Sequence, residues 1–143
     1  MRIHEIINEG YKEAKSELIY DMMLQEIECG PMDGGCVVYA RAAQIAFGGE
    51  IYCLICSPQR GAADNIAQHA FLKVGNRAID YHNDSNPKRL AGHFQKEELD
   101  YAGGNISGIR LMIPSDLEDA PRNEKLSMKI AEILKGLDES RFH

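Results

Sequence analysis

The chain has 143 residues, of which 44% are hydrophobic and 27% charged, and its net charge is −6 at pH 7. This composition is that of an ordinary globular protein, long enough to bury a core in one domain without a disulfide or a metal ion. The acidic balance, without a basic stripe, excludes a nucleic-acid surface, and no apolar stretch approaches the roughly 20 residues of a membrane span.

The first element expected along the chain is a helix over residues 2–28, because apolar residues recur there at helical spacing. A break is expected near Gly10, so residues 1–10 could form a separate N-terminal arm on the single domain 1–143. The start of the chain, Met1 to Glu5, is charged and no apolar signal-peptide region follows. We therefore expect a cytoplasmic protein whose four cysteines are free thiols.

Cys36 follows the pair Gly34-Gly35 and opens an amphipathic run that ends before Gly48-Gly49, which predicts a second helix. A cysteine at a helix N-terminus faces free backbone N–H groups and the positive end of the helix dipole, so its thiolate is favoured. The preceding glycines let a loop and a substrate backbone approach closely. The alternative is that Cys36 is a small buried hydrophobe on a packed helix.

Residues 49–57 are rich in β-formers and predict a strand inside a sheet. Residues 58–65 lack periodicity and form a connection long enough to be a flap above a site. Residues 68–82 then read as a β-hairpin, two short apolar-rich runs joined at Gly75-Asn76.

The hairpin carries a histidine on its first strand and a carboxylate on its second. If Gly75 and Asn76 are the two turn residues, Asp80 is the diagonal neighbour of His69 on one face of the sheet. Asp80 would then hold the imidazole in one tautomer and stabilise its charged form, while the other ring nitrogen serves Cys36. His82 shares that face and is the alternative candidate for the base.

The rest of the chain predicts a turn over residues 83–87, a short helix over 95–102, a last strand over 106–113 and an amphipathic helix over 123–137. Strands joined by a tight hairpin imply an antiparallel sheet. The expected fold class is therefore α+β, with a nucleophile helix packed on a small antiparallel sheet and flanked by N- and C-terminal helices.

Cys53 and Cys56 form a Cys-x-x-Cys pair, a spacing typical of zinc or redox sites. Here the pair lies inside a predicted strand, where residues three apart point to opposite faces, so burial of both thiols is favoured over a zinc site made with Cys29 and Cys36. We expect no metal and no organic cofactor. The spacing identifies no partner for His93, which is expected at the surface.

The Gly-Gly-Cys helix opening, with Tyr39 and Ala40 behind the cysteine, resembles the papain-like cysteine hydrolase superfamily, as do the His-Ala-Phe-Leu-Lys-Val strand and the Ala-Ile-Asp strand end. The nearest branches are transglutaminase-like domains and small cell-wall endopeptidases. The resemblance covers about residues 30–85. It implies a papain-like fold in which Cys36 is the nucleophile, His69 the general base and Asp80 the orienting carboxylate.

The chain departs from that pattern in three respects. The glutamine that builds the papain oxyanion hole is missing shortly before Cys36, where residues 30–33 stand and Gln25 is further back. The chain has no tryptophan, a residue common around the histidine of transglutaminase-like domains. Asp33 would oppose a Cys36 thiolate unless it caps the helix.

The sequence therefore predicts a thiol hydrolase of the cysteine peptidase or amidase kind, which attacks an amide, isopeptide or thioester bond of a protein or peptide substrate through a Cys-His-Asp triad. The alternatives are a non-catalytic binding or structural protein with the same fold, and an acyltransferase using the same thiol. The first nine residues also resemble the starts of small proteins of tailed bacteriophages, which implies a phage-encoded protein.

Overall fold

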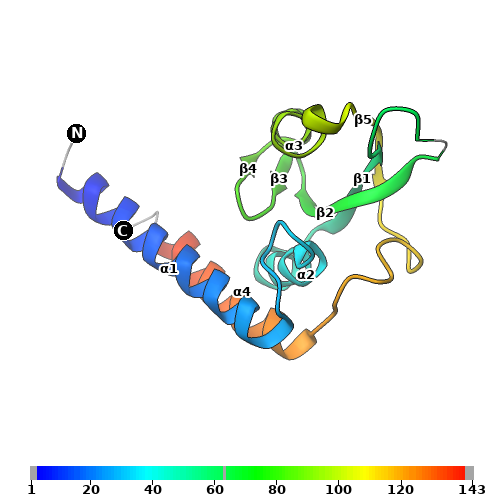
Figure 1. The fold of residues 1–143 in the computed structure, drawn as a ribbon. Coiled ribbons are helices and arrows are strands. Elements are labelled where there is room, and N and C mark those ends of the chain that lie inside the picture. The colour runs from blue at the N-terminus through cyan, green and yellow to red at the C-terminus, as the bar shows by residue number, and fades with distance from the viewer. Residues whose placement is uncertain (1–2, 63, 141–143) are drawn as a thin grey trace.

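A computed structural model describes residues 3–62 and 64–140, and its fold is α+β as predicted. Figure 1 shows the helices around one sheet. In chain order the elements are α1 (Ile3–Ile27), α2 (Cys36–Phe47), β1 (Glu50–Ser57), β2 (Ile66–Val74), β3 (Arg77–Ile79), β4 (Asp84–Ser85), α3 (Pro87–Phe94), the π-helical segment η1 (Gln95–Leu99), the 3₁₀ turn η2 (Asp100–Ala102), β5 (Asn105–Leu111) and α4 (Glu124–Ser140).

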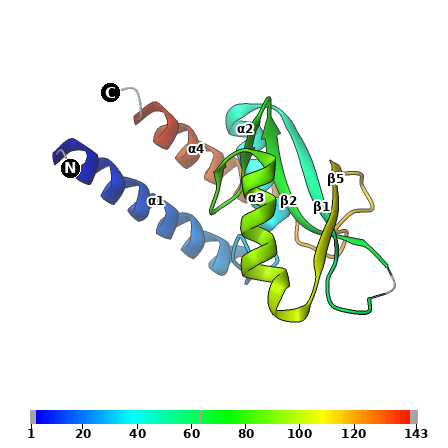
Figure 2. The same ribbon diagram turned by 90° about the horizontal axis from the view of Figure 1, so that it is seen from above.

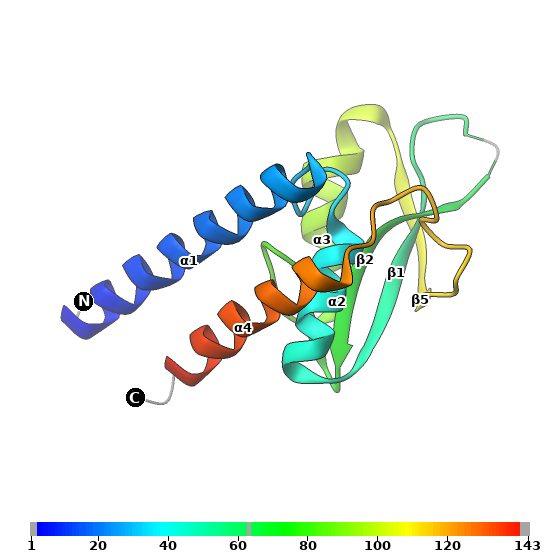
Figure 3. The ribbon, with the colours of Figure 1, turned by 90° about the horizontal axis from the view of Figure 1, so that it is seen from below.

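The five strands form one sheet in the order β4-β3-β2-β1-β5, with every neighbouring pair antiparallel. Helix α2 packs on one side of the sheet and α3 on the other, while α1 and α4 lie beyond α2 (Figure 1). Figures 2 and 3 show α1 and α4 side by side, running in opposite directions and extending past the sheet. The fold therefore has a central sheet with α3 on one side, α2 on the other, and the α1–α4 pair outside α2.

The break expected near Gly10 is wrong, because α1 runs without interruption from Ile3 to Ile27. A single glycine costs a helix only about 1 kcal/mol relative to alanine, which flanking helical turns can offset. From Ile3 onward, the residues expected to form a separate arm are therefore the first turns of this helix. Residues 1–2 lie outside the described range.

The hairpin register agrees with the prediction. Val74 pairs with Arg77 and Leu72 with Ile79, which leaves Gly75 and Asn76 as the two turn residues. Gly75 has φ +58°, and Asn76 has no positive φ, the combination that a type II′ hairpin turn needs. The turn chemistry thus fixes which face of the sheet receives each side chain.

The segment after the hairpin differs from the predicted turn. Asp84–Ser85 form the short edge strand β4, and Asn86 caps α3 by accepting a hydrogen bond from the backbone N–H of Arg89 at 2.9 Å. Pro87 stands at the first turn of that helix, a position proline favours. A helix therefore begins eight residues before the predicted Gln95 and continues into η1 and η2.

The last two predicted elements are close to those observed, since β5 covers Asn105–Leu111 and α4 begins at Glu124. Asn123 caps α4, accepting the backbone N–H of Leu126 at 3.0 Å. Helix α4 holds α2 through the buried Ser127 hydroxyl, which donates to the Val38 carbonyl at 2.9 Å. These contacts fix the helix that carries Cys36.

The connection over residues 58–65 is not a flap above Cys36. Its Arg60 N–H donates to the Ala102 carbonyl at 2.9 Å, so this loop packs against η2 at the far end of the sheet (Figure 1). Among the helices that the structure describes, none is long and apolar enough to cross a membrane.

Candidate active site

Cys36 is the first residue of α2, and the loop before it is closed tightly. A side chain at Gly35 would collide with the Gly30 carbonyl and with Met23 of α1. The glycine before the cysteine therefore serves the packing of the chain's own loop, a reason different from the substrate approach we predicted. The Asp33 side chain accepts the Gly30 N–H within this loop.

Asp33 does not cap the helix that begins at Cys36. The N-cap of α2 is Gly35, and no side chain caps the helix. Asp33 points back to Gly30 instead, so the helix N–H groups stay free to face Cys36. The backbone N–H of Cys36, at the start of the helix, helps to lower the pKa of its thiol.

His69 reaches Cys36 because β2 has a free edge beside it. Strand β3 ends at Ile79, where the chain turns away through a hydrogen bond from the Asp80 N–H to the Asn83 carbonyl. The part of β2 that precedes Leu72, which includes His69, therefore has no β3 neighbour on that side. Helix α2 fits there: Cys36 receives hydrogen bonds from the Ala70 N–H and from the His69 side chain.

His69 and Asp80 meet as the register predicts. The distance from His69 Nε2 to Asp80 Oδ2 is 2.8 Å, and both side chains are buried. Since Nε2 is bound to Asp80, Nδ1 is the ring nitrogen left for Cys36. The three predicted side chains thus lie in one chain of contacts, in the order thiol, imidazole, carboxylate.

The second oxygen of Asp80 is held by three donors. Its Oδ1 accepts the N–H groups of His82 and Asn83, and the Asn83 side-chain amide, at 2.8–2.9 Å. Our sequence reading placed Asn83 only in a turn. An Asp whose side chain bonds the N–H groups two and three residues on is a recurrent turn pattern, so the Asp-x-x-Asn spacing was the signal available.

The charges of the three groups stabilise one another. Burial alone would lower the pKa of His69, but hydrogen bonds to Asp80 and Cys36 outweigh it and raise that pKa to about 9. Burial alone would raise the pKa of Cys36, but the hydrogen bond and charge of His69 outweigh it and lower that pKa. The arrangement therefore favours the thiolate form of Cys36 beside a protonated His69.

Asp80 stays ionised in the same way. Burial opposes its charge, but the hydrogen bond and charge of His69, with the Asn83 amide, hold the pKa of Asp80 below its usual value. Phe94 of α3 stacks on the His69 ring, with centroids 5.0 Å apart. The imidazole is therefore fixed both by a carboxylate in its plane and by an aromatic ring over its face.

His82, the alternative base, does not occupy that position. Its side chain is exposed and its ring contacts Tyr81 and His93. Its backbone N–H, not its ring, touches the site by donating to Asp80. His93, expected at the surface, is half-buried and lies 3.3 Å from the Asn83 amide through Nδ1.

The other cysteines have a different environment. Cys53 and Cys56 are fully buried in clusters on opposite sides of the sheet, as the strand pattern predicted, and burial raises their pKa values to about 12 and about 11. Burial, with the nearby charge of Asp33, also raises the pKa of Cys29. Among the side chains that the structure describes, Cys36 is thus the only cysteine whose pKa is lowered.

The structure also bears on the alternative of a zinc site made by Cys53 and Cys56 with Cys29 and Cys36. No group of three or more His, Cys, Asp or Glu side chains in the described part of the chain is arranged to hold a metal ion. Gln25, the glutamine that stands further back from Cys36 than the papain pattern requires, is exposed on α1.

Comparison of the chain with protein-family models, with curated proteins and with solved structures gives no match.

Proposed function

We propose that this protein is a papain-like cysteine hydrolase that cleaves an amide, isopeptide or thioester bond of a protein or peptide through Cys36, His69 and Asp80. The observation that carries the proposal is the continuous contact from the Cys36 thiol through His69 to Asp80, with 2.8 Å between Nε2 and Oδ2, at the N-terminus of α2. A thiol, a base and a group that orients the base are the parts of nucleophilic catalysis.

In the first step the Cys36 thiolate attacks the carbonyl carbon of the substrate, and the carbonyl oxygen takes the negative charge. The free N–H groups at the start of α2, that of Cys36 among them, are the donors placed to stabilise this oxyanion. The bond to the leaving group then breaks as the His69 imidazolium gives it a proton. The products are a thioester on Cys36 and a free amine from an amide or isopeptide, or a free thiol from a thioester.

In the second step a water molecule attacks the thioester carbon. Neutral His69 takes a proton from this water, the carbon–sulfur bond breaks, and Cys36 leaves as a thiolate. The acid product is released and the imidazolium–thiolate pair is restored. Asp80 makes and breaks no bond in either step, since its role is to fix the ring and stabilise its positive charge.

Two alternatives use the same residues. An acyltransferase would pass the acyl group from Cys36 to an amine instead of to water. A binding or structural protein would keep the fold without turnover, and one observation favours it: Cys36 is only 7% exposed and His69 only 2%. Hydrolysis passes the acyl group from Cys36 to water, the acyltransferase passes it to an amine, and the binding protein forms no acyl-enzyme. Following the acyl group therefore separates the three.

The test exposes the protein to a library of peptide amides, isopeptides and thioesters and follows the acyl-enzyme by intact-protein mass spectrometry. We expect an adduct on Cys36 that decays in water. Cys36→Ala should abolish the adduct, and His69→Ala should cost nearly as much because members of a catalytic unit are not additive. Asp80→Ala should cost less. Cys29→Ala, which removes a thiol of raised pKa, is the matched control and should leave the adduct intact.

Each alternative predicts its own result. An adduct that persists in water and is discharged by an added amine would establish the acyltransferase. Absence of any adduct across the library, with Cys36 inert to small thiol reagents in the folded protein, would decide for the binding protein.

A further inference from the structure

A cavity of about 310 Å³ adjoins the triad on the side of the α3–η1 segment. Its wall includes Asp80 of the triad and Phe94, whose ring stacks on His69. Met32, from the loop that delivers Cys36, closes another side. The cavity is therefore bounded by the nucleophile loop, the carboxylate and the aromatic support of the base, and its size suits a single side chain better than a long polymer.

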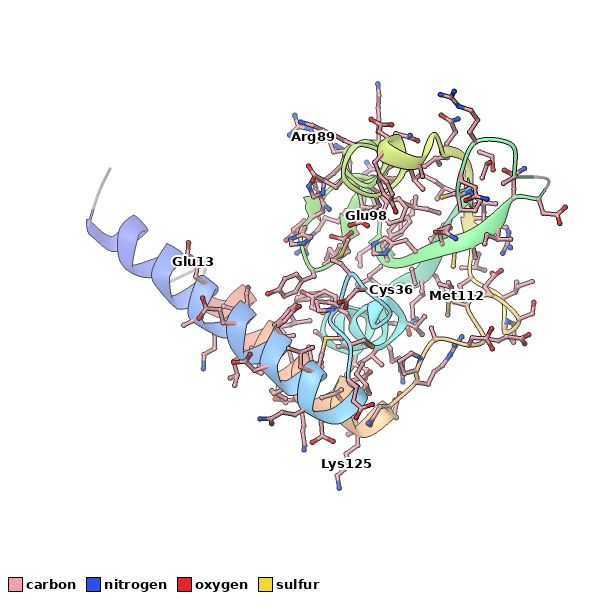
Figure 4. All side chains as sticks on the ribbon, viewed as in Figure 1. Glu13, Cys36, Arg89, Glu98, Met112 and Lys125 are labelled. Atoms are coloured by element: carbon pink, nitrogen blue, oxygen red, sulfur yellow. The ribbon has the colours of Figure 1, made fainter. Side chains whose placement is uncertain are left out.

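The rest of the wall carries negative charge without a cation. Glu97 and Glu98 line the cavity with two histidines, His82 and His93, and no Lys or Arg is among the lining residues. Glu97 is exposed, whereas Glu98 is half-buried. In the view of Figure 4, Glu98 lies on the side of the α3–η1 segment that faces Cys36.

Glu98 differs from the other acidic side chains that the structure describes. The two buried ones are paired, Asp80 with His69 and Asp116 with Arg110, and the remaining ones are exposed. Glu98 alone among them is partly removed from water with no hydrogen bond or ion pair to the protein. A carboxylate on the wall of a cavity, without a partner in the protein, is available to pair with a positively charged ligand.

The backbone that carries these carboxylates is also unusual. Gln95–Leu99 is a π-helical segment, a rare conformation often found at functional sites, and it carries both Glu97 and Glu98. Gln95 fixes this segment: its side chain donates to the Gly104 carbonyl at 2.8 Å and accepts the Ile106 N–H at 3.1 Å. The carboxylates are therefore held on a rigid support beside the triad.

We propose that this cavity binds a cationic side chain of the substrate, a primary ammonium or guanidinium on an aliphatic stem, with Glu98 as its charge partner. The stem would pack on Met32 and Phe94, and Glu97 would add negative charge at the mouth. This inference rests on the proposed hydrolase activity and names its substrate class: peptides with a lysine- or arginine-like residue next to the cleaved bond.

The test compares peptide amides that carry lysine or norleucine at each position flanking the cleaved bond, since norleucine keeps the stem and lacks the ammonium. The wild-type kcat/KM should favour lysine at one position, and Glu98→Gln should reduce that preference about fivefold, the upper end of the range for a partly exposed ion pair. Glu98→Lys should shift the preference toward glutamate at the same position. Glu13→Gln, an equal charge change far out on α1 (Figure 4), should leave the preference unchanged.

A second measurement is independent of turnover. Titration calorimetry of the Cys36→Ala protein with the same peptides should show tighter binding of the lysine peptide, lost in the Cys36→Ala, Glu98→Gln double variant. Binding without turnover would contradict the hydrolase and keep the cation site. Turnover with equal preference for lysine and norleucine, or an effect of Glu98→Gln no larger than that of Glu13→Gln, would overturn the cation site and keep the hydrolase.

Discussion

At the scale of single residues, the charge state of the site depends on one buried contact. His69 is almost fully buried, and burial alone would make its ring neutral. The carboxylate of Asp80 at 2.8 Å reverses that effect. Asp80 is in turn kept ionised mainly by His69 itself, and the Asn83 amide and the His82 N–H of the turn after β3 add smaller contributions.

Asp80→Asn tests this dependence while preserving shape. Without the carboxylate charge, burial should dominate and the pKa of His69 should fall from about 9 toward or below its ordinary value. Hydrolysis should decrease by about 10²–10⁴, because a neutral ring neither stabilises the thiolate nor protonates the leaving amine. The pKa is measured by NMR titration of the His69 ring. A His69 pKa that stays near 9 in the variant would refute the role given to Asp80.

At the scale of secondary-structure elements, the hairpin was predictable because its turn and its side-chain alternation agree. Gly75-Asn76 specifies a two-residue turn, and that turn fixes the register that brings Asp80 to His69. Helix α3 was not predicted, because its start depends on the Asn86 cap and on Pro87 rather than on an apolar pattern. Its only buried side chains are Leu90 and Phe94, too few to mark a helix by periodicity.

The turn can be tested with two identical substitutions. Gly75→Ala should destabilise the protein by about 1 kcal/mol, because φ +58° strains any residue with a Cβ and nothing else crowds that position. Gly136→Ala, in the interior of α4 with open space around it, should stabilise the protein by roughly 0.5–1 kcal/mol. Both changes are measured by urea unfolding. Equal effects of the two substitutions would show that the turn conformation differs from type II′.

At the scale of the whole molecule, the site depends on helix packing far from the sheet. Helix α2 carries Cys36, and α1 and α4 cover its outer side in one continuous apolar cluster with Leu72 and Ile79 of the sheet. The sequence predicted these helices from their periodicity. It did not predict that β3 would end early and leave an edge of β2 open for α2, since that depends on the Asp80–Asn83 turn.

Ile130 tests how far the site relies on this packing. This α4 side chain is fully buried in the cluster that α4 shares with α1 and α2. Ile130→Ala should therefore lower the free energy of unfolding by about 2–5 kcal/mol and the melting temperature by on the order of 10 °C. Met128→Ala, on the exposed side of the same helix, should change stability by less than about 0.5 kcal/mol. Calorimetry measures both. A small effect at Ile130 would mean that α4 is not part of the cooperative core.

The central claim is that Cys36, His69 and Asp80 form one charged unit in which His69 lowers the pKa of the Cys36 thiol. The most direct measurement is the rate of iodoacetamide alkylation of Cys36 against pH, followed by peptide mapping with Cys29 as internal reference. Because the pKa of Cys36 is lowered and that of Cys29 raised, Cys36 should react first and keep reacting at mildly acidic pH. In His69→Gln burial should then raise the Cys36 pKa above its ordinary value and abolish this advantage. Alkylation spread evenly over the cysteines, or a Cys36 rate unaffected by His69→Gln, would contradict the account.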